Sequence, residues 1–461
     1  MANELTILSD FDFDAPQPIA FNDPDWHRFD VDGVSSVFIA DGSRIYSLSN
    51  DIAEAFDTAD SQQDLLSDFG IPRMNAVSDV PLLEMPIKAL SLAIAQKCNL
   101  GCTYCYAEGG SFGGEARNMT LDVARRSVDQ LFANAHPNES VNLSFLGGEP
   151  FTNRAVLCEV TQYAVQVARN KSVKLGLSVT TNGTLLTSDD ADFLEQHGFA
   201  VTVSLDGVAD THDQLRSYKG GRGTYDHIMM RLQPLLQRQR SMQVSARVTV
   251  TPSNLELRKT LDEFISLGFH SVGFSPMLTA PNLKGQMQSE HLQEMLSQMI
   301  DCGRVFEQHV IDGHRYPFTN AVNAMRELHR GTHRPYPCGA GAGYFGVAAD
   351  GKLYACHRFV EDPVGEMGDV DSGVNGPAQS KWLSERHVHF QQPCNGCWAR
   401  YLCGGGCHHE VIKRGRPACD FIRGWLHYSL QAYTRLREKV PEYFGQLASV
   451  NPGVNDVRVR L

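Results

Sequence analysis

Short apolar runs alternate with amphipathic helical segments from about Lys88 to Met277, and this alternation most strongly constrains the fold. The apolar runs are ALSLAIA, VNLSFLG, LGLSVTT, AVTVSLDG, QVSARVTVT and SVGFSPM. Helical patterns lie between them, for example over residues 120–132, from Arg154 onward and over 189–197. Strands that alternate with helices in this way predict βαβ units and a parallel sheet. Six units are too few to close an eight-stranded barrel, so we expect an α/β fold with a partial (β/α)6 TIM-like barrel.

The two ends of the chain differ from this central region. Before residue 85, an acidic start precedes two strand-like runs (26–31 and 36–40), a turn, the strand-like RIYSL and a helical segment over 51–56. After Arg330, glycine and cysteine become frequent, and a segment of this composition needs metal ligands to hold it together. We expect four regions: a small module (1–85), the barrel (86–330), a cysteine-rich domain (331–430) and a C-terminal helix and tail (431–461).

Charge and hydropathy exclude several classes of partner. The 461 residues include 41 Lys and Arg against 53 Asp and Glu, which gives a net charge of -12. This overall field repels nucleic acids and anionic membranes, and no local basic patch offsets it. The sequence has no apolar run of about 18 residues and no signal-peptide pattern. We therefore expect a cytoplasmic protein with no nucleic-acid partner and no membrane partner.

The 12 cysteines are clustered, which favours metal chemistry in a reducing compartment over a disulfide framework. Cys98, Cys102 and Cys105 form the first group. The second group comprises Cys338, Cys356, Cys394, Cys397, Cys403, Cys407 and Cys419. Cys158 and Cys302 are isolated in amphipathic helical segments, and we expect both in the core, because free cysteine behaves as a small buried hydrophobe.

The first group forms the motif CNLGCTYCY directly after the first barrel strand. Three thiolates in a C-x3-C-x2-C spacing can wrap a loop around one [4Fe–4S] cluster and leave its fourth iron open to a substrate or cofactor. The alternative is a structural zinc site, but zinc takes four ligands and this loop supplies three. The spacing therefore favours an iron–sulfur cluster on Cys98, Cys102 and Cys105.

With Tyr104 before its third cysteine, this motif resembles that of the radical S-adenosylmethionine (SAM) enzymes. GGE at 147–149, TTNGT at 180–184 and SLDG at 204–207 follow in the order typical of that family, and then come His212 and Arg216. Each lies at a strand end, where barrel enzymes place their ligands. The resemblance implies that Glu149 binds the SAM amino group, Ser204 its ribose or methionine part and Arg216 its carboxylate, with Asn182 and Gly183 only forming a turn. The full set of implied SAM contacts is Tyr104, Gly147, Gly148, Glu149, Ser204 and Arg216.

The later cysteines resemble the seven-cysteine pattern of the SPASM extension, which carries auxiliary clusters in peptide-modifying radical SAM enzymes. The resemblance implies three [4Fe–4S] clusters in all. The cluster on Cys338, Cys356 and Cys407 has only three thiols in the motif. Its fourth ligand is either a side chain such as His333 or a substrate thiol. A zinc ribbon over 394–407 is the alternative. We expect His408 and His409 to be solvated or hydrogen-bonded. The implied auxiliary sets are Cys394, Cys397, Cys403 and Cys419 for one cluster, and Cys338, Cys356 and Cys407 for the other.

The N-terminal region resembles the small winged-helix-like (PqqD-like) peptide-recognition domain that precedes the barrel in several maturases. Such a domain takes an extended leader segment by adding a strand to its sheet edge. The resemblance implies a small protein or peptide substrate that binds through a leader segment. The alternative is an extension that only packs on the barrel.

Together these resemblances imply a radical SAM peptide maturase that receives electrons from an external donor such as flavodoxin or ferredoxin. The size, the leading module and the CGAG and CHRF runs resemble the thioether-forming subgroup, which joins cysteine sulfur to carbon atoms of acidic residues in the small subunit of quinohemoprotein amine dehydrogenase. The alternatives are a sulfatase-maturing-type oxidase, another carbon–carbon cross-linking SPASM maturase, and a non-catalytic iron–sulfur electron relay or scaffold.

His357 is the candidate catalytic residue. Sulfatase-maturing enzymes carry an acidic base immediately after the cysteine that corresponds to Cys356, and this chain has His357 there. An imidazole can take a thiol proton near neutral pH, and an imidazolium favours a thiolate. The alternative is that His357 only donates a hydrogen bond to a cluster sulfur.

Overall fold

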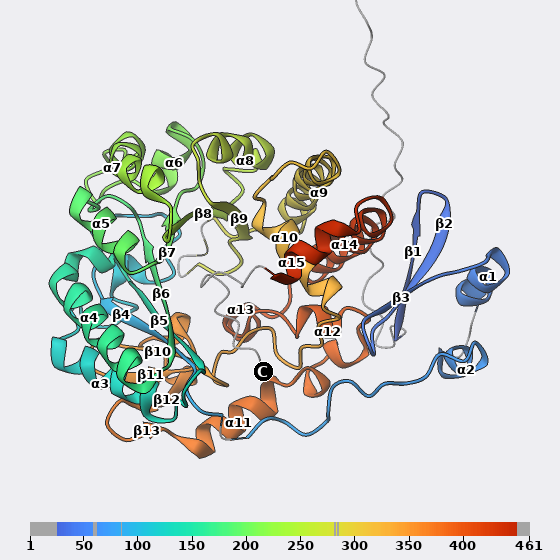
Figure 1. The fold of residues 1–461 in the computed structure, drawn as a ribbon, viewed down its shortest axis with the longest axis horizontal. Helices are drawn as coiled ribbons and strands as arrows, with labels where there is room; N and C mark the ends of the chain where they lie inside the picture. The colour runs from blue at the N-terminus through green and yellow to red at the C-terminus, as the bar shows by residue number, and fades with distance from the viewer. Residues whose placement is uncertain (1–24, 59–61, 84, 281–282, 284, 450–461) are drawn as a thin grey trace, which may run out of the picture.

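The central alternation folds into six parallel strands of one sheet (Figure 1). The structure is a computed structural model that describes residues 25–58, 62–83, 85–280, 283 and 285–449. Among these residues no strand pairing joins the last barrel strand to the first, so the barrel is open, as predicted. The strands, which lie side by side in chain order, are β4 (Ala89–Ala95), β5 (Ser140–Gly147), β6 (Lys174–Thr181), β7 (Ala200–Ser204), β8 (Gln243–Val250) and β9 (Ser271–Pro276).

Helices between the strands cover the outside of the barrel sheet (Figure 1). The Thr120 side chain caps the first of them by accepting from the Val123 N–H, and a capping box of Thr187 and Asp190 begins the third. Their apolar faces bury residues such as Leu131 and Leu194. These helices, three of them predicted from the sequence, are α3 (Leu121–Ala133), α4 (Arg154–Lys171), α5 (Ser188–Gln196), α6 (Asp210–Leu215), α7 (Tyr225–Arg238) and α8 (Leu257–Ser266).

The sheet continues past the barrel into the cysteine-rich region, which the domain boundary expected at 330 does not anticipate. β10 (Tyr344–Val347) pairs in parallel with β4. β11 (Lys352–Tyr354), β12 (Glu366–Asp369) and β13 (Gly373–Val374) add antiparallel strands beyond it. All four residues of β10 are buried, so this short run satisfies the open edge of β4 as an apolar barrel strand would. The result is one 10-stranded sheet.

The N-terminal module is a separate three-stranded antiparallel sheet with two helices. It contains β1 (Trp26–Val31), β2 (Val34–Ile39), β3 (Arg44–Ser47), α1 (Asn50–Thr58) and α2 (Gln62–Asp68). These elements match the strands and the helix that the sequence predicts, whereas the acidic start lies outside the described residues. The module has its own small core, made of Val37, Ile39, Phe56 and Leu66.

Polar and aromatic contacts hold the module against the cysteine-rich region. The Arg400 guanidinium pairs with Asp25 at 2.5 Å. The His27 ring stacks on Trp398, with 3.9 Å between ring centroids, and its Nε2 lies 2.8 Å from Nδ1 of His427. Since Trp398 and Arg400 lie between Cys397 and Cys403, the module docks directly on part of the second cysteine group.

The glycine- and cysteine-rich sequence after Arg330 predicts few helices, but the structure has α11 to α15 there. The expected boundary at 430 falls inside a long helix, α14, because its apolar face packs on α9 over most of its length. Cys302 is buried in α9 as predicted, whereas Cys158 on α4 is only partly buried. The helices are α9 (Ser289–Ile311), α10 (Thr319–His329), α11 (Gly376–Arg386), α12 (Arg400–Cys403), α13 (His408–Arg414), α14 (Cys419–Lys439) and α15 (Glu442–Ser449). Short 3-10 helices are η1 (Glu108–Gly110), η2 (Pro150–Asn153), η3 (His357–Phe359), η4 (Pro363–Gly365), η5 (Val388–Phe390) and η6 (Cys394–Gly396).

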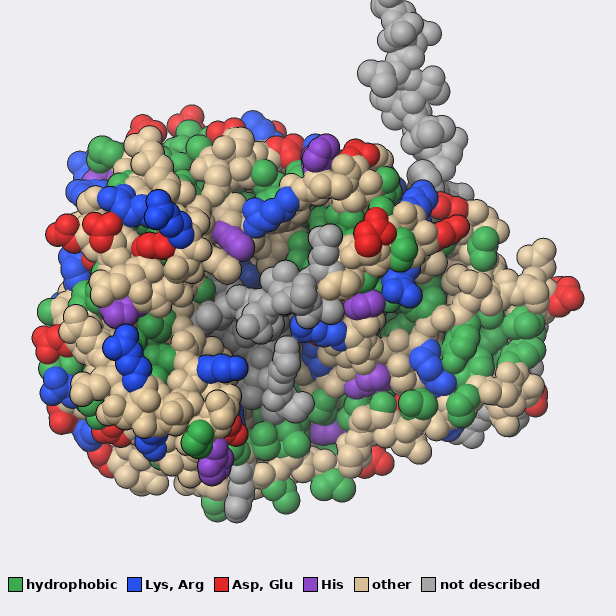
Figure 2. All heavy atoms as spheres, in the orientation of Figure 1, with side chains coloured by type: hydrophobic (Ala, Val, Ile, Leu, Met, Phe, Trp, Pro, Cys, Tyr) green, Lys and Arg blue, Asp and Glu red, His purple; other side chains and the backbone are tan. Residues whose placement is uncertain are grey.

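Acidic and basic side chains are interspersed over the face of the molecule shown in Figure 2. This distribution agrees with the expectation, made from the sequence, of a surface without a dominant basic patch. None of the described helices is both long enough and apolar enough to span a bilayer.

Candidate functional site

The first cysteine loop follows β4 and is held by backbone hydrogen bonds to the segment after α6. The N–H of Gly101 donates to the carbonyl oxygen of Ser217 at 2.9 Å, and the N–H of Thr103 donates to that of Leu215 at 3.1 Å. The loop therefore has a fixed path across the carboxyl ends of the strands, and its three cysteines share that path.

Gly147 and Gly148 lie against the backbone of this loop. A Cβ on Gly147, whose φ is +143°, would lie 2.3 Å from the carbonyl oxygen of Ala95, and one on Gly148 would lie 2.2 Å from that of Lys97. The N–H groups of Gly148 and Glu149 donate to these same oxygens at 2.8 and 2.9 Å. The resemblance assigns both glycines to SAM binding, but here they are required first for contact between two segments of the chain.

Glu149 is completely buried at the end of β5. Its Oε1 accepts from the Thr181 hydroxyl at 2.8 Å and the Phe151 N–H at 3.1 Å, and its Oε2 accepts from the Asn182 N–H at 2.7 Å. Burial nevertheless raises the pKa of Glu149 to about 7. A buried carboxylate of this kind gains from a bound cation, so the position suits an ammonium group.

Two donors, one after the end of β6 and one at the C-terminus of α6, are directed at the first thiols. The Asn182 amide nitrogen lies 3.6 Å from the sulfur of Cys98, and Nη1 of Arg216 lies 3.9 Å from that of Cys102. Burial raises the pKa of Cys102 to about 12, so these thiols need nearby donors or a metal to ionise. The sequence interpretation gave Asn182 only a turn role; its position in TTNGT, at a strand end beside the cysteine loop, was the available signal.

Arg216 and Tyr104 both contact Asp206, a residue that the sequence interpretation did not single out. Arg216 Nε pairs with a carboxylate oxygen of Asp206 at 2.6 Å, and the Tyr104 hydroxyl donates to the same oxygen. His212 accepts from the Asp206 N–H at 3.3 Å. The carboxylate bound by the Arg216 Nε is therefore the chain's own, and Asp206 orients both predicted SAM contacts.

Ser204 ends β7 and is partly exposed, at the same carboxyl edge of the sheet as Glu149. The structure thus brings the first cysteine loop, the GGE turn, Ser204 and Arg216 to one edge of the barrel, as the sequence predicts from their strand-end positions.

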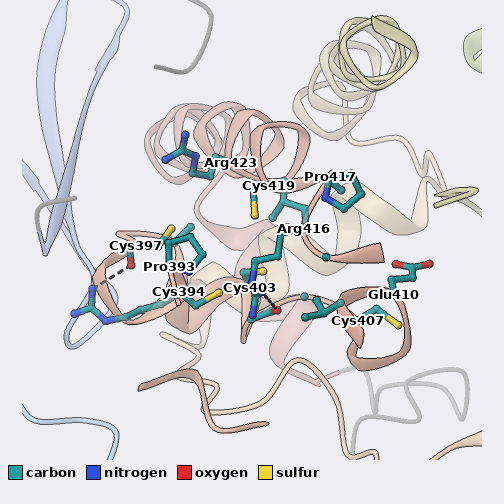
Figure 3. Close-up of a pocket in the computed structure, with 18 of the residues that line it drawn as sticks. Pro393, Cys394, Cys397, Cys403, Cys407, Glu410, Arg416, Pro417, Cys419 and Arg423 are labelled. Atoms are coloured by element: carbon teal, nitrogen blue, oxygen red, sulfur yellow. Dashed lines mark hydrogen bonds between the residues drawn. The ribbon is translucent and has the colours of Figure 1, made fainter. Parts of the chain in front are cut away.

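Five later thiols line one cavity at the C-terminal side of the barrel (Figure 3). The cavity also contains Arg416, whose side chain reaches in among the thiols and is bonded to Gln391 Oε1 at 2.7 Å. The charge of Arg416 opposes the effect of burial, which raises the pKa of Cys394 to about 12. Sequence interpretation missed Arg416, and no motif marks it. The lining cysteines are Cys394, Cys397, Cys403, Cys407 and Cys419.

Mutual effects between thiols divide the later cysteines into two sets. Cys397, Cys403 and Cys419 raise the pKa of Cys394. Cys338 and Cys407, by contrast, raise the pKa of Cys356, which is buried at the start of η3. Figure 3 shows Cys407 at the far side of the cavity beside Glu410, away from Cys397. The assignment of these thiols to two clusters stays a prediction. Among the described residues, no three His, Cys, Asp or Glu side chains converge closely enough to hold a single metal ion.

Three histidines lie in positions that differ from those expected. His333 packs 5.9 Å from the Tyr401 ring, and the charges of Asp41 and Arg44 act on it, so it lies at the contact with the N-terminal module. His408 and His409, expected to be solvated or hydrogen-bonded, are buried, with one nitrogen of each lacking a partner among the described residues. Their rings pack instead edge-on against aromatic side chains, those of Trp382 and Phe359.

His357 lies between the two cysteine groups. Its Nδ1 is 2.7 Å from the Tyr344 hydroxyl, and its ring is 6.1 Å from that of Tyr106, the residue after Cys105. Burial, together with the charge of Arg358, lowers the pKa of His357 to about 4. The imidazole is therefore neutral at neutral pH, which removes the imidazolium role and makes it a weak base.

Similarity to known proteins covers more of the chain than the barrel strands alone. Residues 92–265 match the model of the Radical SAM superfamily. An uncharacterized protein of Archaeoglobus fulgidus is 26% identical over 362 residues, which cover 74% of this chain and 80% of that protein. A cysteine-type anaerobic sulfatase-maturating enzyme of Clostridium novyi is 23% identical over 345 residues, covering 70% of this chain and 89% of that enzyme.

A solved structure of native anSMEcpe with bound AdoMet has the same fold. It aligns with a TM-score of 0.64 at 19% sequence identity and covers 78% of this chain and 100% of that chain. The resemblance to radical SAM enzymes is therefore confirmed. The named relative is a sulfatase-maturating enzyme and not a thioether-forming one, so the sequence comparison favours the alternative over the subgroup first expected.

Proposed function

The chain carries a radical SAM domain, and we propose that it acts as a maturase on a side chain of a peptide or small protein. One observation carries this proposal: Tyr106, beside Cys105, packs on both His357 and Arg358, which follow Cys356. The SAM-cluster loop and a second set of thiols thus adjoin, as an enzyme with auxiliary clusters requires.

The residues of the first loop suit a [4Fe–4S] cluster with SAM. Burial raises the pKa of the Cys98 and Cys102 thiols, and two donors are directed at their sulfurs. The bound cluster and SAM supply a 5′-deoxyadenosyl radical that removes a hydrogen atom from an unactivated carbon.

The chain's own residues would bind and orient SAM. Glu149 would pair with its ammonium group, because a buried carboxylate with a raised pKa gains from an adjacent cation. Asp206 would orient Arg216, which keeps a second guanidinium nitrogen near Cys102 and free to bind a carboxylate. Ser204, at the same sheet edge, would contact the ribose or methionine part.

We propose two auxiliary [4Fe–4S] clusters on the two later thiol sets, which brings the total to three. Four thiols surround Arg416 in one set, and Cys338, Cys356 and Cys407 form the other. An external donor such as flavodoxin or ferredoxin would supply electrons, and the N-terminal module would bind the leader segment of the substrate. Support for a peptide substrate comes from a relative named as a sulfatase-maturating enzyme and from a solved structure of anSMEcpe with a bound peptide.

The reaction best supported by the relatives is oxidation of a substrate side chain, as in sulfatase maturation. This chain departs from the sulfatase pattern at His357, which replaces the acidic base. That departure favours a second candidate, the thioether cross-link between cysteine sulfur and a carbon atom of an acidic residue, as in the small subunit of quinohemoprotein amine dehydrogenase.

SAM cleavage tests the proposal directly. We expect the anaerobically reconstituted protein to form 5′-deoxyadenosine with dithionite and SAM, and the Glu149→Ala variant to lose at least about tenfold in rate at subsaturating SAM. A Glu115→Ala variant, changed at a residue outside the described contacts, serves as the control. An iron-loaded protein that forms no 5′-deoxyadenosine would identify an electron relay or scaffold instead.

Substrate products separate the two reactions. Candidate peptides that contain Cys, Ser, Asp and Glu would be incubated with the enzyme and examined by mass spectrometry. Oxidation to an aldehyde leaves a product that reacts with hydrazine reagents. A thioether removes a pair of hydrogen atoms and leaves no thiol to alkylate and no aldehyde.

A further inference from the structure

Arg358 occupies a position between the two cysteine groups that the proposed function does not use. Its Nη1 lies 2.7 Å from Oε1 of Glu410 and 3.8 Å from the sulfur of Cys407. Its guanidinium carbon lies 5.3 Å from the centre of the Tyr106 ring. The guanidinium thus contacts a thiol of the later cysteines, Cys407, and a tyrosine adjacent to the first cysteine group.

The guanidinium is buried and incompletely satisfied. The Arg358 side chain is 18% exposed and that of Glu410 16%. Nε of Arg358 is a buried donor with no hydrogen-bond partner within the described part of the chain. A buried N–H on a charged group is costly to leave unpaired, so this donor favours a nearby acceptor.

Arg358 remains a cation in this position. A guanidinium is protonated throughout the physiological pH range, and the carboxylate of Glu410 is paired with this one at 2.7 Å. Lys413, on the same helix as Glu410, is paired with Asp362 at 2.6 Å. Arg358 is therefore the cation with a donor directed at a thiol of this set, and Glu410 is its counter-charge.

We propose that Arg358 is a positioning residue that raises the reduction potential of the cluster on Cys338, Cys356 and Cys407, and that Glu410 opposes it. This inference rests on the proposed function in so far as that set holds a cluster. Reduction adds one electron to the cluster, and a fixed positive charge with N–H donors near a ligating sulfur stabilises the reduced form. The aromatic ring of Tyr106 holds the plane of the guanidinium.

A redox titration followed by EPR tests the proposal. The titration uses the Cys98→Ala, Cys102→Ala, Cys105→Ala background, in which the SAM cluster is absent and two auxiliary clusters remain. We expect Arg358→Met to lower one auxiliary potential by about 59 mV, equivalent to about tenfold in the ratio of reduced to oxidised cluster. Glu410→Gln is expected to shift the same potential upward, because it leaves the cation unopposed. The other auxiliary cluster, around Arg416, should not shift in either variant.

Lys413→Met is the matched control. It removes a cation from α13, the helix that carries Glu410, and this cation is paired with Asp362 and not with a thiol. It should leave both potentials unchanged. Equal potentials in Arg358→Met, Glu410→Gln and the parent would overturn the proposal, and so would shifts of the same sign. If Arg358→Met fails to bind iron, the upward shift in Glu410→Gln decides the outcome.

Iron content separates this inference from the proposed function. A parent protein that binds iron only at the first loop would show that the Cys356 set holds no cluster, and the auxiliary part of the proposed function would fail. A parent with both auxiliary EPR signals, and with neither potential sensitive to Arg358 or Glu410, would refute the inference alone.

Discussion

The first cysteine loop and the later cysteines are held in place by different means. The first three thiols lie on one short loop, and the barrel fixes that loop with backbone hydrogen bonds to residues 215–217 and with the close contact of Gly147 and Gly148. The later thiols come from distant positions along the chain. Five of the seven line a cavity formed by glycines and short helical turns, with Arg416 among them, and Cys338 and Cys356 lie outside that lining.

This difference shows which site depends on its metal for structure. Strand pairing and an apolar core build the barrel, so the first loop can persist without its cluster. The later segment has fewer strands, and it buries thiols that repel one another when ionised. Metal binding there supplies free energy of folding as well as chemistry.

The largest effect should come from removing the first cluster. Replacing Cys98, Cys102 and Cys105 by alanine should abolish SAM cleavage and remove about a third of roughly twelve irons. The melting temperature should change by only a few degrees, because the barrel core is intact. Iron analysis, a 5′-deoxyadenosine assay and thermal unfolding measure these outcomes. Retained cleavage would end the radical SAM mechanism for this chain, and a collapse of the melting temperature would break the contrast drawn above.

The next effect should come from the later cysteines. Cys394→Ala with Cys419→Ala should lower stability more than the first-loop variant does and should expose the segment around residues 390–420 to proteases. Limited proteolysis with mass mapping would locate the cuts. Cys158→Ala, which lies outside both groups, is the control. If the segment around residues 390–420 resists proteases in the variant as well as the barrel does, protein contacts alone hold the second site.

SAM affinity should depend on the protonation of Glu149. Its pKa of about 7 lies above the usual carboxyl value because of burial, so the carboxylate that would attract the SAM ammonium is lost as the pH falls through 7. Affinity should fall about tenfold between about pH 8 and pH 6, measured by calorimetry on the cluster-loaded protein. Glu149→Gln should bind SAM weakly and with a flat profile over that range. A profile identical to the wild type in Glu149→Gln would assign the titration to another group.

Docking of the N-terminal module should have a smaller effect. Arg400, next to the second cysteine group, pairs with Asp25, and we expect Asp25→Asn to raise the rate of iron loss from the auxiliary sites by a few-fold while basal SAM cleavage persists. Asp32→Asn, which breaks a 4.0 Å pair between the module and Lys439 at the end of α14, away from the second cysteine group, is the control. Iron release to a chelator gives the rate. Equal rates in both variants would show that the module and the cluster segment are independent.

The smallest effect is expected at His357. Its imidazole is neutral, hydrogen-bonded to Tyr344 and of low pKa, so His357→Gln should preserve most hydrogen bonding and change product formation by no more than about twofold. The assay compares 5′-deoxyadenosine with modified peptide. Uncoupling, in which 5′-deoxyadenosine forms without product, would restore His357 as the base.

Sequence patterns predicted the barrel and the cysteine loop because both depend on residues that are neighbours along the chain. Apolar alternation marks β4 to β9, and strand ends mark Glu149 and Arg216. Residues that act through distant contacts were missed: Asp206 pairs with Arg216 across a loop, and Arg416 reaches the thiols from a segment without a motif. The pairing of β10 with β4 also joins distant segments, and no local pattern specifies it.

Histidines show the same limit. His333 is close in sequence to Cys338, yet its side chain lies in the contact with the N-terminal module. His408 and His409 follow a cysteine and look polar in sequence, yet aromatic rings enclose them. Burial depends on the tertiary path of the chain, and residue type alone does not determine it.

The parallel pairing of β4 with β10 has a consequence for synthesis of the chain on the ribosome. β4 is the first barrel strand to emerge, and it pairs with β5 soon afterwards, but its other edge must wait until the segment near residue 344 has been translated. During that interval an apolar strand with unpaired backbone groups is open to wrong partners. This interval ends only when residues 344–347 have emerged and paired with residues 89–92.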